Sequence, residues 1–242
     1  AAALTAGRAM AAAGADWLDV GGESTRPGAE PVPAAVEIAR VVPVVAGLRA
    51  AGVRQPISVD TSKGEVAEAA LAAGADAVND VTGGRDPRLL AAAAGARCPL
   101  VLMHMQGTPA TMQAAPRYDD VVGEVEAALA RALAAAVAAG VAESAVLLDP
   151  GIGFGKTVAH NLALLGALPR LTAALGRPLV VGVSRKSLLA ALAGADLPPA
   201  RRDGPSHAAH ALLAPRCALL RVHDVPGARA ALRLSAALAE AA

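Results

Sequence analysis

The apolar residues of this chain gather in seven short runs, and each run ends in polar residues or glycines. The runs are WLDVGG at 17–22, PISVDTS at 56–62, AVNDV at 77–81, LVLMHMQG at 100–107, VLLDPG at 146–151, LVVGVSRKS at 179–187 and LLRVHDV at 219–225. Alanine-rich segments typical of helices lie between them. Strands that alternate with helices favour crossover connections and a parallel sheet covered on both faces. The pattern therefore predicts an α/β fold.

Polar residues and glycines mark where the helices begin and end. Thr61 or Ser62 is expected to cap a helix that ends at Gly74. The acidic pair at 119–120 suits the start of a long helix that stops near Gly140. Such caps work because a side-chain oxygen accepts hydrogen bonds from the free N–H groups of the first turn, while glycine permits the turn that ends a helix.

Seven strand–helix units are one short of a closed (β/α)₈ barrel, and the unit that is missing is the first. Residues 1–14 have the pattern of the helix that follows an opening strand, and no Met precedes them. We therefore expect a TIM barrel that forms a single domain over residues 1–242 and is N-terminally incomplete. Any site residue carried by the first strand would lie outside this sequence.

Composition narrows the function to an enzyme domain acting on small molecules. The chain has 242 residues, with 22 basic and 21 acidic side chains, so it creates no field that would attract nucleic acid or an anionic membrane. Its two cysteines, Cys98 and Cys217, are too few for a disulfide framework and suit a reducing cytoplasm. Glu126 and Arg131 interrupt the longest apolar helix, which argues against a membrane span. We expect a cytoplasmic protein.

Barrels of this kind hold their chemistry at the carboxyl ends of the strands, so the polar residues after the runs form one surface. Oxygens of Asp149 and Asn79 can accept hydrogen bonds from the donor edge of a heterocycle. Arg221, His223 and a helix start near Ser187 would hold an anion such as phosphate. The candidates at this surface are Asp19, Glu23, Asp60, Asn79, Asp80, His104, Asp149, Ser184, Arg185, Lys186, Arg221 and His223.

The stretch LDPGIGFGK at 148–156 places Asp149 at a strand end and follows it with three alternating glycines. The glycines allow a tight turn where a side chain would obstruct a flat ligand or a neighbouring loop. A plain glycine turn without chemistry is an equally good interpretation of this stretch alone. A nucleotide-binding phosphate loop is excluded, because the glycine it requires six residues before Lys156 is replaced by Pro150.

Other candidates have structural interpretations of their own. Asp60 and Asp80 could cap helices or pair with lysines, and Arg221 could pair with Asp224. His104, between two methionines, suits packing as well as ligand contact.

A metal site on the histidines is the weakest interpretation. His207 and His210 lie three residues apart on a predicted helix, but no Asp, Glu or Cys completes a ligand set at suitable spacing. We therefore do not expect these two histidines to bind a metal.

Seven strings together resemble the dihydropteroate synthase family. They are GGESTRPGAEPV at 21–32, SVDTSK at 58–63, NDVTGG at 79–84, LMHMQGTP at 102–109, LDPGIGFGK at 148–156, GVSRKS at 182–187 and RVHDV at 221–225. They occur in the family's order and span essentially the whole chain. SRKS and RVHD are the most specific, whereas the acid and glycine motifs are shared with pterin-binding methyltransferases.

The resemblance implies a transferase of folate biosynthesis from a family that sulfonamides target. Its members condense 6-hydroxymethyl-7,8-dihydropterin diphosphate with 4-aminobenzoate, which gives 7,8-dihydropteroate and pyrophosphate. It also implies Mg²⁺ as a cofactor, bound by an asparagine of the missing first segment, and a homodimer. The expected partners are thus the two small-molecule substrates.

The resemblance also assigns roles to individual residues. Asp60, Asn79 and Asp149 match positions that hold the pterin, and Lys186 matches a lysine that contacts the pterin and the second substrate. In such a reaction the pterin methylene carbon gains positive charge as pyrophosphate departs, and a carboxylate such as Asp60 can stabilise it. Met103 and Phe154 would line the pocket.

The remaining assignments concern the diphosphate and the second substrate. Arg221 and His223 match the pair that binds the diphosphate, and with Mg²⁺ they would stabilise it as it leaves. Thr25 and Arg26 match a mobile loop that closes over the site. The helix start at Ser187 matches the region that receives the aminobenzoate carboxylate.

Two alternatives stay open beside an active synthase. One is a pterin-binding methyltransferase domain that moves a methyl group from methyltetrahydrofolate to a cobalamin protein. The other is a synthase-like protein that binds pterin or a partner without turnover. Lys186, Arg221 and His223 favour the synthase, because methyl transfer releases no diphosphate and needs no such cations.

Overall fold

The computed structural model describes residues 1–194 and 196–241, and its strands are all parallel. A five-stranded sheet contains, in sequence order, β1 (Leu18–Gly21), β2 (Ile57–Asp60), β3 (Ala77–Asp80), β4 (Leu100–Met103) and β5 (Val146–Asp149). A second sheet pairs β6 (Val180–Val181) with β7 (Leu219–Leu220). Each strand lies within one of the predicted apolar runs, so the strand predictions are confirmed.

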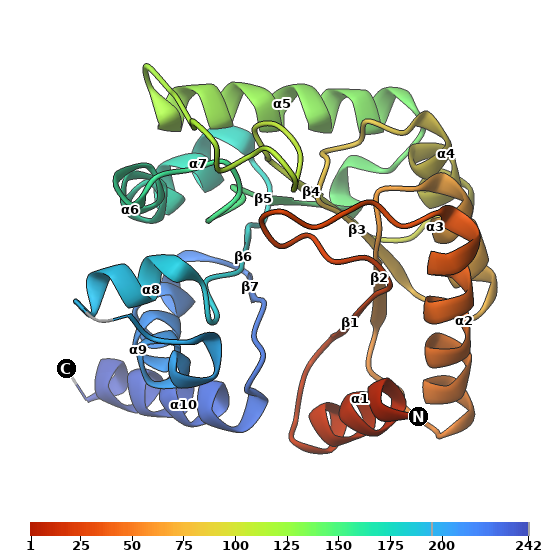
Figure 1. Cartoon of the computed structure of the whole chain (residues 1–242), viewed down its shortest axis with the longest axis horizontal. Helices are drawn as coiled ribbons and strands as arrows, with labels where there is room; N and C mark the ends of the chain where they lie inside the picture. The colour runs from red at the N-terminus through yellow and green to blue at the C-terminus, as the bar shows by residue number, and fades with distance from the viewer. Residues whose placement is uncertain (195, 242) are drawn as a thin grey trace.

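The two sheets follow one another around an incomplete barrel. An isolated bridge between Leu148 and Leu179 joins β5 to the residues just before β6. On the other side, β7 and β1 lie across an opening (Figure 1), and in the described part of the chain no strand pairs with both. Residues from both sides of the opening, among them Leu18 and Leu220, line a cavity of about 430 Å³. The α/β barrel prediction is confirmed, with the open side between β1 and β7.

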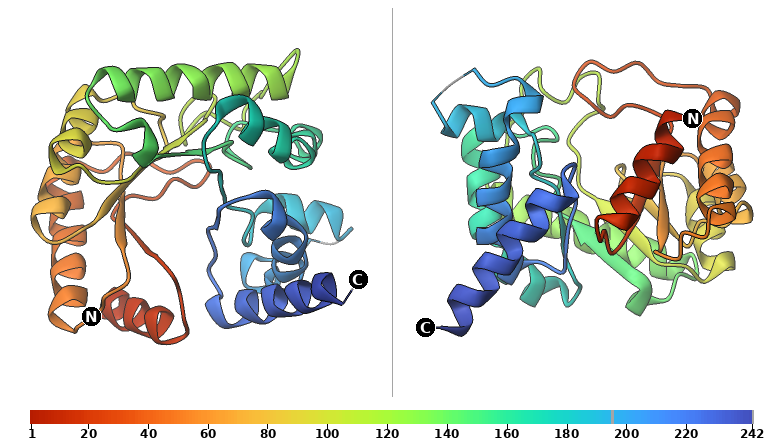
Figure 2. Two further views of the ribbon diagram at one scale, coloured as in Figure 1. Left: turned by 180° about the vertical axis from the view of Figure 1, so that it is seen from behind. Right: turned by 90° about the horizontal axis from the view of Figure 1, so that it is seen from below.

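The helices lie outside the strands, as the views in Figure 2 show. They are α1 (Ala2–Ala12), α2 (Ala34–Ala50), α3 (Gly64–Ala72), α4 (Pro87–Ala96), α5 (Val121–Ala138), α6 (Val158–Gly166), α7 (Leu168–Leu175), α8 (Ser187–Leu192), α9 (Asp203–Leu213) and α10 (Val225–Glu240). Among the described helices none alone is long and apolar enough to cross a membrane, although the bent pair α6 and α7 reaches that length and composition jointly.

The strands are held in place by a shared apolar core. Ile57, Val59, Leu100 and Leu148 are completely buried between the strands and the helices. Because transfer of apolar surface out of water is the main driving force of folding, at roughly 25 cal/mol per Å², these runs are fixed as buried strands. The polar residues that follow them are consequently brought to one end of the barrel.

The predicted caps are partly confirmed. Asp120 caps α5 by accepting a hydrogen bond of 3.1 Å from the backbone N–H of Val122. The cap predicted for α3 is wrong, since the helix starts later, after Lys63, and its first N–H group, of Gly64, donates to Asp86 of a neighbouring loop instead. Thr61 accepts from the N–H of Lys63 and so shapes the turn before the helix.

Candidate active site

The parallel register brings the predicted site residues side by side. Asp60, the last residue of β2, is opposite Asn79 in β3, and Asp149, the last residue of β5, is opposite Met103 in β4. Arg221 directly follows β7. The carboxyl ends of the strands therefore form a single polar surface, as the sequence predicted.

Arg221 makes two ion pairs across the open side of the barrel. Its Nε donates to Asp19 Oδ2 at 2.6 Å, and its terminal nitrogen donates to Asp60 Oδ2 at 2.8 Å. The alternative pairing of Arg221 with Asp224 is wrong, because Asp224 caps α10 and lies 3.0 Å from His207. Residues from the two ends of the chain thus meet in one cluster.

Asp19 connects this cluster to the neighbouring strands. Besides Arg221, it accepts hydrogen bonds from Ser58 Oγ at 2.6 Å and from Asn79 Nδ2 at 3.1 Å. The sequence pattern places Asp19 at the carboxyl ends of the strands but assigns it no role. Its position in the β1–β2 register, opposite Ser58, is the signal that could have indicated these contacts.

The cluster has unusual proton affinities. Burial and the nearby Asp19 raise the pKa of Asp60 to about 7, although Arg221 opposes the shift. The same carboxylates raise the pKa of Arg221, with Asp19 the largest cause, so that the guanidinium stays charged. Because Arg221 is the influence that lowers the pKa of Asp60, the proton affinity of this carboxyl depends on what else binds Arg221.

Asp149 and Lys186 have opposite charges and influence each other's pKa. Asp149 Oδ1 accepts from the N–H of Gly151 at 2.7 Å. Lys186 donates to the carbonyl of Ile152, and its Nζ lies 4.4 Å from the centre of the Phe154 ring. Burial raises the pKa of Asp149, whereas Lys186 is the main influence that lowers it. Burial lowers the pKa of Lys186 to about 8, while Asp149 opposes that change.

His223 is positioned by the loop that follows β6. Its Nδ1 lies 3.0 Å from Ser184 Oγ, which also accepts from its backbone N–H at 3.2 Å. Burial and the charges of Arg185 and Arg221 lower the pKa of His223. The imidazole is thus biased toward its neutral form beside two cations.

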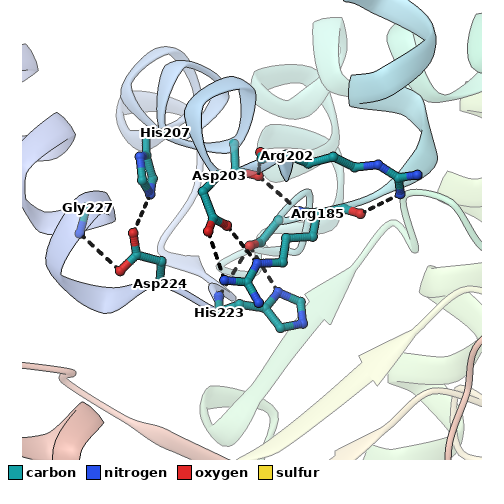
Figure 3. Close-up of polar contacts among 9 residues, drawn as sticks. Arg185, Arg202, Asp203, His207, His223, Asp224 and Gly227 are labelled. Atoms are coloured by element: carbon teal, nitrogen blue, oxygen red, sulfur yellow. Dashed lines mark hydrogen bonds and ion pairs between the residues drawn. The ribbon is translucent and has the colours of Figure 1, made fainter. Parts of the chain in front are cut away.

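Arg185 has a structural part in this loop, which Figure 3 shows. The backbone of Arg185 lies in the left-handed region, with φ 58°. Its guanidinium donates to both carboxylate oxygens of Asp203, at 2.6 and 2.9 Å. Its carbonyl accepts from Arg202 at 2.9 Å, and its N–H donates to Ser206 at 3.0 Å. These bonds fix the backbone just before Lys186. Ser187 is exposed at the first position of α8.

The loop between β1 and α2 lies across the carboxyl ends of the strands (Figure 1). The N–H of Gly28 donates to the carbonyl of Pro109, in the loop after β4, at 3.0 Å. Thr25 lines a small cavity of about 50 Å³ that Asp60 also lines. Arg26 is exposed, and its charge is one of those that lower the pKa of His223. The two predicted loop residues are thus brought to the same end of the barrel as Asp60 and His223.

Lys63 anchors this loop to α2. Its Nζ lies 2.7 Å from Glu23, which begins the loop, and 2.6 Å from Glu37, which is fully buried in α2. Glu23 also accepts from the N–H of Val32 at 2.6 Å. One ammonium group therefore joins two carboxylates from different segments.

Replacing Lys63 with methionine should destabilise the protein by about 3 kcal/mol, because it leaves the buried carboxylate of Glu37 without its partner. Chemical unfolding followed by circular dichroism measures this change. The matched control is Arg88→Met, which removes cation contacts with two exposed glutamates and should cost less than about 1 kcal/mol. Equal losses of stability in the two variants would contradict the anchoring role.

Three further candidates have mainly structural surroundings. Asp80 is fully buried and accepts hydrogen bonds from Thr82 and Gly84. It therefore stabilises the turn after β3 and does not act as a helix cap. Met103 packs in a small apolar cluster with Val81, Met105 and Met112, against which Phe154 also packs. His104 lies 3.0 Å from the ammonium of Lys156, and burial lowers its pKa to about 3.

The described residues contain no group of three or more His, Cys, Asp or Glu side chains that could hold a metal ion. His207 and His210, the two histidines of α9, have ring centres 6.3 Å apart. The strand-end carboxylates Asp19 and Asp60 already share Arg221. The residues of this part of the chain therefore do not fit a magnesium site of their own.

Comparison with known proteins gives consistent matches. Residues 1–223 match the family model described as pterin binding enzyme. The dihydropteroate synthase of Mycobacterium leprae is 47% identical over 239 residues, which cover 96% of this chain and 83% of that protein. Two solved structures are among the similar ones. Xanthomonas albilineans dihydropteroate synthase with 4-aminobenzoic acid has a TM-score of 0.91 at 49% identity, covering 98% of this chain and 84% of that one. The Yersinia pestis dihydropteroate synthase with a sulfonamide drug has a TM-score of 0.92 at 42% identity. The match covers 98% of this chain and 85% of that one.

Proposed function

This chain belongs to the family of pterin-binding enzymes, and we infer that it catalyses the reaction of dihydropteroate synthases. The substrates are 6-hydroxymethyl-7,8-dihydropterin diphosphate and 4-aminobenzoate, and the products are 7,8-dihydropteroate and pyrophosphate. The observation that carries this proposal is the cluster at the strand ends, in which Arg221 lies 2.8 Å from Asp60. Arg221 supplies a cation that can bind the leaving diphosphate, and the neighbouring Asp60 supplies a carboxylate that can stabilise the developing carbocation.

The pterin is proposed to bind between β2, β3 and β5. Asp149 and the amide oxygen of Asn79 can accept hydrogen bonds from the ring nitrogens of the pterin and its amino group. Asn79 Nδ2 already donates to Asp19, which leaves its oxygen available to a ligand. Phe154 and Lys186 lie beside Asp149 and would cover the flat ring.

Binding of the diphosphate would change the partners of Arg221. In the free protein its guanidinium is held by Asp19 and Asp60. A diphosphate at Arg221 and His223 competes for the same donors, which frees the carboxylate of Asp60 to face the methylene carbon. The carbon–oxygen bond can then break with its developing positive charge opposite a carboxylate and its leaving anion on a cation.

The amine of 4-aminobenzoate needs no strong base, since it is neutral at physiological pH. As the carbon–oxygen bond to the diphosphate breaks, the amine attacks the cationic methylene carbon with its lone pair, and the new carbon–nitrogen adduct then loses a proton to solvent. We propose that Lys186 and the exposed start of α8 at Ser187 orient this substrate. Thr25 and Arg26, on the loop across the strand ends, would exclude water from the cation.

Mg²⁺ belongs to this proposal as a companion of the diphosphate. Because the described residues do not form a metal site, no step is assigned to the ion. A homodimer stays a prediction from the family resemblance, and a cytoplasmic location stays a prediction from the composition of the chain.

The proposed function is tested by measuring pyrophosphate release from the pterin diphosphate. We expect release that requires 4-aminobenzoate and increases with Mg²⁺. Release without 4-aminobenzoate would indicate simple hydrolysis. Methyl transfer from methyltetrahydrofolate to a cobalamin protein, with no release of pyrophosphate, would indicate the methyltransferase. Binding of the pterin diphosphate without release of pyrophosphate would indicate the inactive protein.

A further inference from the structure

Lys156 lies buried where the loops after β4 and β5 meet, with only 3% of its surface exposed. Its Nζ donates to the carbonyls of Gly151 and Phe154, each at 3.0 Å, and to the carbonyl of His104 at 3.4 Å. It also lies 3.0 Å from His104 Nδ1, which must be the acceptor because an ammonium group has only donors. None of the ion pairs found among residues 1–194 and 196–241 includes Lys156.

The two loops meet backbone to backbone. Gly151 and Gly155 have φ values of 68° and 63°. A Cβ on Gly151 would collide with the carbonyl oxygen of His104, and one on Gly155 would lie 2.6 Å from that of Gln106. Carbonyl oxygens therefore converge at this junction. The carbonyl of Gly151 also accepts from the N–H of Phe154 at 3.0 Å, whereas for the carbonyls of His104 and Phe154 the ammonium of Lys156 is the donor found among the described residues.

The loop that Lys156 holds also carries the parts of the pterin site. The N–H of Gly151 donates to Asp149, and the carbonyl of Ile152 accepts from Lys186. The ring of Phe154 lies under Lys186. A shift of this short loop would therefore move the acceptor, the cation and the aromatic ring of the site together.

We propose that Lys156 is a positioning residue for the condensation: its ammonium fixes the 151–155 loop against His104 and thereby sets the geometry of Asp149, Phe154 and Lys186 around the pterin. The inference rests on the proposed function. It assigns Lys156 no contact with either substrate.

The charges at the junction support this role. Asp149 and Lys186 act directly on Lys156, Arg85 and Arg131 act on its partner His104, and Arg221 acts on Asp149. Burial lowers the pKa of Lys156 to about 7, and Asp149 is the group that opposes the shift. In return, the charge of Lys156 helps to lower the pKa of Asp149, which burial raises. Removing Lys156 should therefore make Asp149 easier to protonate.

The test is steady-state turnover of Lys156→Met between pH 5.5 and 8.5, roughly one and a half units on either side of the pKa of about 7. We expect KM for the pterin diphosphate to rise about tenfold, with a smaller change in kcat, because the pterin site loses its alignment. The acidic limb of kcat/KM should move to higher pH. The matched control is Arg177→Met, which removes a cation from the carbonyls of Ser144 and Val146 at the other end of β5 and should leave KM and the pH profile unchanged.

Each outcome decides between the alternatives. If the wild type shows no turnover, the proposed function itself fails. If the wild type turns over and a folded Lys156→Met variant keeps its KM and pH profile, the positioning role is overturned. Where Lys156→Met does not fold, Lys156→Gln, which keeps a donor but no charge, takes its place in the same assays. Loss of folding in both would overturn the proposal, since Lys156 would then serve the stability of the whole chain.

Discussion

Replacing Arg221 with methionine is expected to lower kcat for dihydropteroate formation by roughly 10²- to 10³-fold, the loss that follows removal of one preorganised group that stabilises transition-state charge. Arg221 is the cation that joins Asp19 and Asp60 at the strand ends, and the proposed step transfers it to the departing diphosphate. Methionine keeps most of the side-chain volume and removes the charge. Steady-state kinetics with both substrates varied would measure the effect.

The Arg221→Met variant also has an expected pH signature. Because Arg221 opposes the rise in the pKa of Asp60, its loss should raise that pKa further above about 7. Asp60 then gains a proton at higher pH, so the acidic limb of the rate profile should shift upward. Arg170→Met, which breaks a 3.2 Å surface pair with Glu126, is the control and should leave both readouts unchanged. An Arg221→Met enzyme with unchanged kcat would refute the role of Arg221 at the diphosphate.

Replacing Lys186 with methionine is expected to lower kcat/KM by about 10²-fold, since it removes a charged partner that contacts the substrates in the proposed complex. Lys186 lies 4.4 Å from the ring centre of Phe154, and among the groups around Asp149 it is the largest influence that lowers the pKa of that carboxyl. Without Lys186, Asp149 should hold its proton to higher pH. Calorimetric titration with the pterin diphosphate measures the binding part of this loss.

The kinetic part of the Lys186→Met prediction separates two roles. A rise in KM for both substrates means that Lys186 contacts both, as proposed. A rise for the pterin substrate alone would confine it to the pterin. Unchanged KM and kcat values for both substrates, in a variant that melts at the wild-type temperature, would be inconsistent with any substrate contact by Lys186.

The strands and the site surface could be predicted from the sequence because both depend on local patterns. Runs such as the one around Val59 are apolar enough to be buried wherever they fall, and parallel pairing then brings residues such as Asp60 and Asp149 to one end. The glycines after Asp149 predict a tight turn where a side chain would obstruct a flat ligand or a neighbouring loop. Gly151 confirms this, since a Cβ there would collide with the carbonyl of His104.

What the sequence could not indicate are contacts between distant residues. Arg221 and Asp19 are 202 positions apart, and no local pattern distinguishes Asp19 from Asp224 as the partner of Arg221. The cap of α3 was missed because Gly64 takes its acceptor from Asp86 in the next loop. Lys156 had no signal as a site residue, because its acceptors are mainly backbone carbonyls, which any residue supplies.

The proposed reaction forms a carbon–nitrogen bond between a pterin and an aromatic amine. Its most direct test is to incubate the protein with the pterin diphosphate and 4-aminobenzoate and to quantify 7,8-dihydropteroate by chromatography and mass spectrometry, together with pyrophosphate. We expect the two products in equal molar amounts, and neither when 4-aminobenzoate is omitted. Pyrophosphate without dihydropteroate, or a bound pterin that is never converted, would contradict it.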